Sequence, residues 1–260
     1  MTSAADAMIL TYHSISGGPP PLCIPPDVFA AQMSWLKANA HVVPLTVLVE
    51  SLAQGQSIPQ RTVALTFDDG FADFYTEAAP ILRRLGLTAV VFLPVAYCGR
   101  TASWHVGTGG RPLMSWAQIR ELAAQGLSFG SHSMTHTDLI HLTDTELAYE
   151  IAESKRLIEA EVRQDVRFFC YPYGCFDERT RRAVSIHYRG GACSTSLRKP
   201  GPAEDRFALP RIDVHYVRNL ALFRSIFTER FRLYLCARRF MRDFGSWIRS
   251  TKRTYRRSLQ

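Results

Sequence analysis

Two adjacent carboxylates stand at the end of a strongly apolar run. Asp68 and Asp69 follow residues 62–67 (TVALTF) and precede Gly70. Neighbouring side chains of an extended backbone point to opposite sides, so one carboxylate could bind a cation while the other faces a substrate. Asp-Asp-Gly is equally good turn chemistry. The motif by itself therefore leaves both a simple turn and a catalytic pair of acids open.

Two histidines, His132 and His136, lie four residues apart just after a short apolar run. They can face one metal ion if the segment forms a helical turn, and one carboxylate would complete a set of three protein ligands. Imidazole suits zinc, copper, iron and nickel. A pair of histidines in a loop is otherwise often only polar surface. Because both motifs follow expected strands, we expect them to meet at one rim of the fold.

Two further segments close apolar runs. Residues 168–174 (FFCYPYG) end in Pro-Tyr-Gly, which favours a turn. Such a turn either aims a backbone N–H outward or only connects to the next helix. His13 ends the first apolar run. A lone histidine in that position is more often a buried, hydrogen-bonded side chain than a catalyst.

Strand-like and helical segments alternate about six times along the chain. Strands are expected at 8–12, 41–45, 62–67, 88–93, 127–130, 166–171, 188–194 and 209–214, and helices at 27–38, 46–53, 75–85, 115–125, 143–162 and 177–187. This alternation is typical of a parallel α/β fold, and strands this apolar are expected when both faces of the sheet are covered. Chemistry in such folds gathers at the carboxyl ends of the strands.

Together these motifs resemble one family. TFDDG, HSMTH and, in part, YPYG are similar to the three core motifs of the polysaccharide deacetylases of carbohydrate esterase family 4, which carry the NodB-homology domain. The resemblance covers roughly residues 8–215. It is closest to the poly-N-acetylglucosamine deacetylase branch, in which a leading Tyr-His strand and a late LPRI segment, here 209–212, flank the core motifs.

This resemblance implies a distorted (β/α) barrel of about seven strands and a hydrolase that removes N-acetyl groups from an N-acetylated sugar or polysaccharide. By motif position, Asp69, His132 and His136 would bind a divalent cation. Zinc is the first expectation, and other first-row transition metals are also compatible. Asp68 would be the general base, and Tyr173 would offer its backbone N–H to the oxyanion.

The general acid and the residue that orients the base depart from the family pattern. In the branch with the leading Tyr-His strand the acid maps to His13, which we favour. In the wider family it is a late histidine, for which His215 is the nearest candidate. Cys170 stands where the third motif usually carries an arginine, and Arg211 of the LPRI segment could supply that charge instead.

The basic charge of the chain is concentrated at its C-terminal end. Of 31 Lys and Arg and 23 Asp and Glu, residues 217–260 hold twelve basic and two acidic residues. Residues 1–216 hold the other nineteen basic and twenty-one acidic residues, so their net charge is slightly negative. We therefore expect a catalytic domain at 1–216, a basic helical tail at 217–260 and no binding of nucleic acid.

Residues 217–249 have the apolar spacing of an amphipathic helix, interrupted near Gly245. The apolar positions are Leu220, Phe223, Phe227, Phe231, Tyr234, Met241, Phe244 and Ile248. Most of the arginines lie off this stripe. The stripe therefore either lies on an anionic membrane surface or packs on the barrel while the arginines stay in water.

The start of the chain, MTSAADAMILTYHSI, has no basic region before its short apolar run, and no stretch of 18 apolar residues occurs. Neither a secretory signal nor a membrane-spanning helix is therefore expected. We expect a cytoplasmic protein, held at the inner face of the membrane if the tail binds lipid.

Two other functions remain open. A hydrolase of the same fold could act on a small amide or formamide, and a panel of substrates separates that activity from deacetylation of sugars. A non-catalytic protein that binds the membrane surface through its tail is the second alternative. The retention of Asp68, Asp69, His132 and His136 together argues against it, because each could be lost without harm to the fold.

Overall fold

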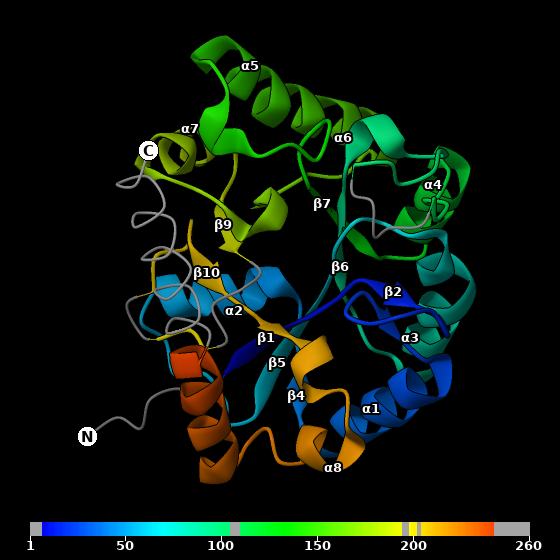
Figure 1. The fold of residues 1–260 in the computed structure, drawn as a ribbon, viewed down its shortest axis with the longest axis vertical. Helices are drawn as coiled ribbons and strands as arrows, with labels where there is room; N and C mark the ends of the chain where they lie inside the picture. The colour runs from blue at the N-terminus through cyan, green and yellow to red at the C-terminus, as the bar shows by residue number, and fades with distance from the viewer. Residues whose placement is uncertain (1–6, 105–109, 194–197, 202–203, 242–260) are drawn as a thin grey trace, which may run out of the picture.

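Parallel strands form the centre of the structure (Figure 1). The structure is a computed structural model, and it describes residues 7–104, 110–193, 198–201 and 204–241. The strands of the large sheet all pair in parallel. The strands are β1 (Met8–Tyr12), β2 (Ser14–Ile15), β3 (Cys23–Ile24), β4 (His41–Val42), β5 (Thr62–Phe67), β6 (Val90–Leu93), β7 (Ser128–Ser131), β8 (Phe168–Cys170), β9 (Gly190–Cys193), β10 (Leu209–Pro210) and β11 (Ile212–Asp213).

The large sheet curls round so that its two edges share one segment of chain. Its order is β10-β9-β8-β7-β6-β5-β1-β11, with β4 paired to the start of β5. Only Arg211 separates β10 from β11 in the sequence, yet Leu209 pairs with β9 and Ile212 pairs with β1. If 209–213 is counted once and the two-residue β4 is set aside, seven strands surround the centre. This confirms the α/β fold of about seven strands that the sequence predicts.

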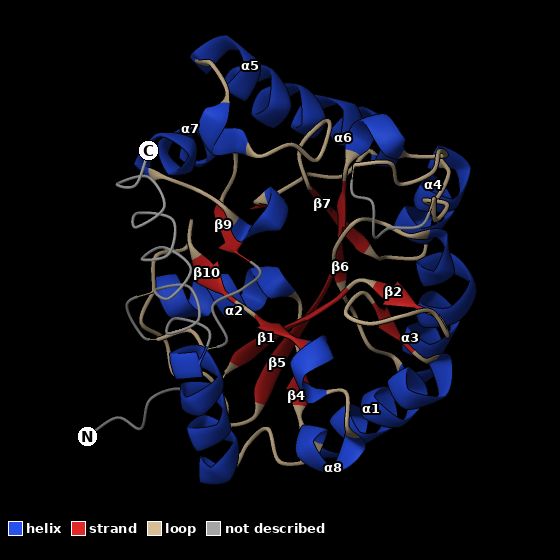
Figure 2. Cartoon of the chain, viewed as in Figure 1, coloured by secondary structure: helices blue, strands red, loops and turns tan. Residues whose placement is uncertain are grey.

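Helices lie around the outside of these strands (Figure 2). Ser115 and Thr143 each form a capping box with the residue three positions later. Gly86, with φ 62°, ends α3 in the left-handed conformation that glycine favours. The helices are α1 (Pro26–Asn39), α2 (Leu45–Ala53), α3 (Ala79–Leu85), α4 (Trp116–Ala124), α5 (Asp144–Ala148), α6 (Ser154–Val162), α7 (Glu178–His187) and α8 (Leu220–Phe223).

The strands are buried from both sides. All five residues of β1 and all six of β5 are buried, because helices cover the outer face and side chains fill the centre. Two local features were not predicted from the sequence. The expected helices 75–85 and 143–162 each contain a π-helical turn, at Phe74–Ala78 and Tyr149–Glu153. In addition, β2 and β3 pair as a small separate sheet directly after the first strand.

The expected helix 217–249 is not continuous. After α8 the chain makes turns at 224–228 and then forms a helix at 229–241, whereas 242–249 lies outside the described residues. Asn219 caps α8 by accepting hydrogen bonds from two backbone N–H groups. None of the helices in the described part of the chain is long and apolar enough to cross a membrane.

Most of the apolar stripe expected in this region packs on the body of the protein, whereas its member Met241 is 57% exposed. Phe223 and Phe231 are fully buried, and the ring of Trp35 lies 5.8 Å from those of Phe223 and Phe227. The hydroxyl of Tyr234 donates a hydrogen bond to the carbonyl of residue 216. This part of the stripe therefore cannot meet a membrane, and packing on the barrel is the correct alternative for it. The expected positions Phe244 and Ile248 lie outside the described residues.

Candidate metal centre and active site

The Asp-Asp-Gly turn places both carboxylates at the carboxyl end of β5. The backbone N–H of Asp68 donates to the carbonyl of Tyr12 at 2.9 Å, which extends the pairing with β1 by one residue. The chain then turns sharply, with φ 69° at Asp69 and 63° at Gly70. The positive φ at Gly70 favours glycine, and a Cβ there would also displace the end of the Leu93 side chain, 2.7 Å away. The motif is therefore both a turn and part of a site.

The histidine pair follows β7 in a loop, not in the helical turn that its spacing suggested. Ser133 and His136 both adopt positive φ, at 66° and 56°. The hydroxyl of Ser133 accepts a hydrogen bond from the N–H of His136 at 3.0 Å and closes the loop. The rings of His132 and His136 thereby come to a centroid distance of 4.6 Å. Strained backbone of this kind is typical of functional sites.

Asp69, His132 and His136 meet at one point, as the sequence predicts. The Oδ1 of Asp69 lies 3.5 Å from Nε2 of His132 and 3.2 Å from Nε2 of His136, and all three side chains are buried. Despite this proximity, no described group donates a well-directed hydrogen bond to that Oδ1. A buried carboxylate oxygen between two imidazole nitrogens is a donor set that fits a divalent cation.

The protonation of these groups suits a cation. Burial, followed by the neighbouring His136, lowers the pKa of His132 to about 4, so its imidazole is neutral at physiological pH. Burial raises the pKa of Asp69, but the neighbouring imidazoles, His136 first and then His13 and His132, bring it below its ordinary value. A neutral imidazole and an ionised carboxylate are the forms in which these side chains bind metals.

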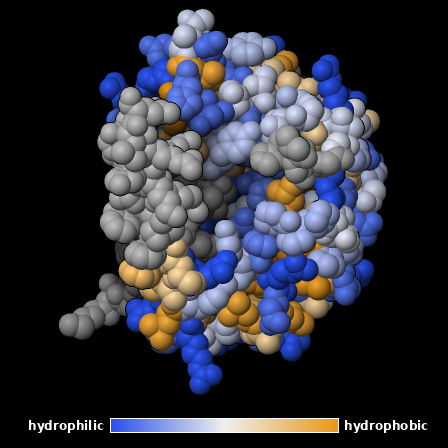
Figure 3. All heavy atoms as spheres, in the orientation of Figure 1, coloured by the Kyte–Doolittle hydropathy of each residue, from blue (hydrophilic) through white to orange (hydrophobic). Residues whose placement is uncertain are grey.

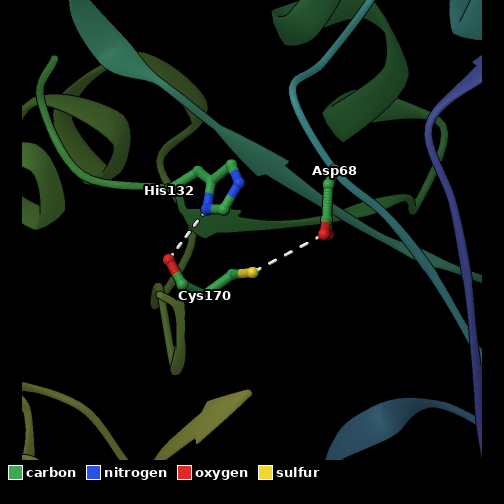
Figure 4. Close-up of side chains that lie close together, drawn as sticks. All are labelled: Asp68, His132 and Cys170. Atoms are coloured by element: carbon green, nitrogen blue, oxygen red, sulfur yellow. Dashed lines mark hydrogen bonds between the residues drawn. The ribbon is translucent and has the colours of Figure 1, made fainter. Parts of the chain in front are cut away.

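His132 also belongs to a second group of potential ligands, with Asp68 and Cys170 (Figure 4). Its Nδ1 lies 2.8 Å from the carbonyl oxygen of Cys170, an interaction that orients the ring. Burial raises the pKa of the Cys170 thiol, and the guanidinium of Arg211 already lies 3.0 Å from its sulfur. Asp68 is engaged elsewhere, as described next. The group around Asp69 is therefore the better metal site.

Arg211 holds Asp68 from the segment that joins the two edges of the sheet. Its Nη1 and Nη2 donate to the two carboxylate oxygens of Asp68 at 2.8 and 2.7 Å. Nη1 also donates to the hydroxyl of Thr66, and Nη2 lies 3.0 Å from the sulfur of Cys170. Burial raises the pKa of Asp68, but the guanidinium of Arg211 lowers it by more. The pKa of Asp68 therefore lies well below its ordinary range, and the carboxyl is ionised. Arg211 thus lies beside Asp68, as expected if it supplies the charge of the arginine that Cys170 replaces in the third motif.

Of the two candidate acids, His13 is the one that lies within 4 Å of Asp68. Its Nε2 is 3.8 Å from Oδ2 of Asp68, and its side chain remains 16% exposed. Burial lowers the pKa of His13, but the surrounding carboxylates, Asp213 first and then Asp68 and Asp69, raise it above its ordinary value. A histidine with a raised pKa is protonated over a wider pH range, as a proton donor requires.

His215 differs from His13 in its surroundings. It lies in the short 3₁₀ helix Val214–Val217, where its ring packs against that of Tyr216 at a centroid distance of 5.2 Å. Burial lowers its pKa, and the nearby arginines 218 and 238 lower it further against the effect of Asp213. The pKa of His215 is therefore shifted in the opposite direction to that of His13.

Aromatic rings enclose His136. Tyr173 lies in the turn Pro172–Gly174 with φ 59°, and its ring meets that of His136 edge-on at 4.8 Å. Trp104 stacks on His136 at 4.6 Å with an angle of 22° between the rings, and Tyr97 packs edge-on against Trp104. No local sequence pattern predicts this contact between Trp104 and His136.

Glu150 is a supporting residue that no local sequence pattern indicates. It is 6% exposed, and its carboxylate accepts hydrogen bonds from the N–H groups of Met134 and Thr135 and from the hydroxyl of Thr135. It lies in the π-helical turn Tyr149–Glu153, within what reads as an ordinary helix. The carboxylate fixes the loop between the two histidines, and the π turn directs it there.

Sequence comparisons identify one family. The profile of the family described as polysaccharide deacetylase matches residues 55–189. The protein YxkH of Bacillus subtilis (strain 168), which is named for the same family, is 32% identical over 216 residues, and the match covers 81% of this chain and 72% of that protein. The poly-beta-1,6-N-acetyl-D-glucosamine N-deacetylase of Staphylococcus epidermidis is 24% identical over 196 residues, with coverage of 71% and 65%.

Solved structures show the same fold. The Streptococcus pyogenes deacetylase PplD, solved in complex with acetate, has a TM-score of 0.71 at 24% identity, and the match covers 81% of this chain and 93% of that one. IcaB from Ammonifex degensii has a TM-score of 0.69 at 21% identity, with coverage of 85% and 97%. At these identities the likeness establishes the architecture alone.

Proposed function

Because the chain belongs to the polysaccharide deacetylase family, we propose that it is a metal-dependent hydrolase that removes N-acetyl groups from an N-acetylated sugar polymer. The observation that carries the proposal is the convergence of Asp69, His132 and His136, with Asp68 ionised beside them. A glycan substrate is supported by the relative that is named for deacetylation of poly-beta-1,6-N-acetyl-D-glucosamine.

Each residue of the site has a distinct proposed role. A divalent cation held by Asp69, His132 and His136, with zinc the first expectation, would polarise the acetamide carbonyl and lower the pKa of bound water. Asp68 accepts the proton of the attacking water, and Arg211 keeps it ionised for that role. The backbone N–H of Tyr173 donates to the carbonyl oxygen as negative charge develops on it.

His13 completes the reaction by donating a proton to the nitrogen of the departing amine. An amide nitrogen leaves poorly without that proton. The 3.8 Å between His13 and Asp68 supports a base and an acid that face one space. His215 remains the alternative acid, and substitution of each histidine separates the two assignments.

The test combines metal content with a panel of substrates. We expect the protein with bound divalent metal to release acetate and free amine from N-acetylglucosamine oligomers and to stop when the metal is removed by a chelator. Asp69→Ala should lose both metal and activity, whereas Asp27→Ala, which removes an exposed carboxylate of α1, should lose neither. Hydrolysis of acetamide or formamide without action on the oligomers would instead identify a small-amide hydrolase. Inactivity of the metal-loaded protein on every substrate would favour a binding protein.

The site of action within the cell is a further proposal. We propose that the chain works in the cytoplasm on a saccharide near an anionic membrane, because residues 217–260 are strongly basic. Fractionation of cells expressing the full chain, with and without a salt wash of the membranes, tests both statements. Recovery of the protein on the external side of the cytoplasmic membrane would contradict the proposed location.

A further inference from the structure

The helix at 229–241 has a second apolar face, which points away from the barrel. Phe231 and Leu235 are buried against the body of the protein, whereas Leu233, Phe240 and Met241 are 66%, 72% and 57% exposed. Residues seven positions apart lie on the same side of a helix, so Leu233 and Phe240 share one face. We call this surface the outer face and define it by its exposed members Leu233, Cys236, Ala237, Phe240 and Met241.

Apart from Met241, which belongs to both, the outer face differs from the apolar stripe for which the sequence left contact with lipid open. Phe231 and Tyr234 of that stripe are held inward, and Tyr234 bonds to the backbone of Tyr216. The guanidinium of Arg238 lies 4.6 Å above the ring of Tyr216. These contacts fix the rotation of the helix on the barrel. A ligand of the helix must therefore meet the outer face.

Positive charge surrounds the outer face. Arg230, Arg232 and Arg239 are exposed on the same helix, and Glu229, which pairs with Arg232 at 2.8 Å, is the one acidic residue of 217–241. The sequence after 241 adds six basic residues and one acidic residue. Figure 3 shows hydrophobic and strongly hydrophilic side chains together at the lower left, where this helix lies in Figure 1.

We propose that the outer face docks the protein on an anionic lipid membrane. Exposed apolar side chains flanked by arginines are what a helix needs to lie in the interface of such a membrane, with the apolar residues among the acyl chains and the arginines at the headgroups. Because the helix is fixed to the barrel, docking would hold the barrel in one orientation over the lipid. This surface is separate from the catalytic site, and its binding does not depend on deacetylation.

The experiment measures co-sedimentation of the full chain with vesicles of phosphatidylglycerol and phosphatidylcholine, or of phosphatidylcholine alone. We expect binding to the anionic vesicles that falls as salt is raised. Leu233→Glu and Phe240→Glu should each lower the partition coefficient about tenfold or more, because a large apolar side chain no longer enters the lipid. The matched control is Ile186→Glu, which places the same charge at a 77% exposed position of α7 and should leave most of the binding intact.

A second measurement reports on the face directly. Cys236 is exposed on the outer face, so an environment-sensitive fluorophore attached to it should shift to the blue when anionic vesicles are added. Cys236→Ser should abolish that shift. All of these variants should keep the same activity on soluble N-acetylglucosamine oligomers, so a failure of docking and a failure of the proposed function remain distinguishable.

Three results would overturn the proposal. The first is recovery of the unmodified chain in the supernatant with anionic vesicles at low salt. The second is an equal loss of binding in Ile186→Glu and Leu233→Glu, which would mean that net charge alone decides. The third is a dimer in the absence of lipid that Leu233→Glu dissociates, which would make the outer face a contact between two copies of the chain.

Discussion

Arg211 and Asp68 are 143 residues apart in the sequence and are joined by two hydrogen bonds, of 2.8 and 2.7 Å. Arg211 is the single residue between β10 and β11, the point at which the chain stops pairing with β9 and starts pairing with β1. The closure of the sheet therefore brings a guanidinium into the protein interior beside the proposed base. The fold and the candidate active site depend on the same five-residue segment, 209–213.

Replacement of Arg211 by Gln should destabilise the protein strongly. It leaves the buried carboxylate of Asp68 without its partner, and loss of one member of a buried pair commonly costs about 3–5 kcal/mol. Urea unfolding at pH 7 measures the change in the free energy of unfolding. The matched control is Arg120→Gln, which breaks the exposed pair with Glu161 and should cost less than about 1 kcal/mol. Equal small losses in both variants would show that the Arg211 pair contributes little.

The same variant has a defined dependence on pH. Because Arg211 lowers the pKa of Asp68, the pair stabilises the folded protein above the ordinary Asp pKa of about 3.9, and this contribution is lost as the pH falls below that value. Without Arg211 the effect of burial is opposed only by the weaker influence of His132 and His13, so the pKa of Asp68 rises. The acid limb of the pH–activity profile should move to higher pH in Arg211→Gln. An unmoved acid limb would assign that limb to another group.

The metal group could be predicted from the sequence because its members belong to short local motifs. Asp69, His132 and His136 each follow an apolar run, and the ends of parallel strands meet at one rim. The loop conformation of the histidines was missed, because a spacing of four residues also suits a helix. Positive φ at Ser133 produces the same convergence without one.

Other features depend on contacts that no local pattern encodes. Trp104 reaches His136 from a long loop, and Glu150 reaches the histidine loop through a π turn that does not interrupt the helical periodicity. The C-terminal segment shows the limit of periodicity most directly. Its sequence contains two apolar faces, and only the packing of Phe231 against the core shows which of them is covered.

Asp68→Asn should keep the metal and lose most of the turnover. The change removes the proposed base and leaves the three ligand side chains in place, and the loss of a general base commonly lowers the rate about 10²–10⁴-fold. Metal content after dialysis and acetate release on the same preparation measure the two effects. Loss of metal together with activity would instead assign the cation to the group of Asp68, His132 and Cys170. Near-normal turnover would remove Asp68 from the role of base.

His13→Ala should abolish most of the activity, and His215→Ala should retain it. The expectation follows from the position of His13 beside Asp68 and from the opposite directions of the two pKa shifts. Because the pKa of His13 is raised, activity should persist to a higher pH than an ordinary histidine allows and then fall on the alkaline side as the proton is lost. Rates on N-acetylglucosamine oligomers across pH 5–10 test both points. Loss of activity only in His215→Ala would reverse the assignment.

Trp104→Ala should weaken metal binding. The two imidazoles are oriented by different contacts. The carbonyl of Cys170 orients His132. The buried Nδ1 of His136 has no hydrogen-bond partner among the described residues, so the Trp104 ring stacked on His136 orients it instead. Loss of a group that orients a ligand commonly costs about 10–100-fold in metal affinity. Competition with a chromogenic chelator measures the dissociation constant of the metal. Thermal unfolding of the metal-free protein establishes that Trp104→Ala and the control variant below are folded. Trp104→Phe keeps a flat ring over His136 and should retain most of the affinity. If Trp104→Ala binds metal as tightly as the unmodified chain, the ring only fills space beside the site.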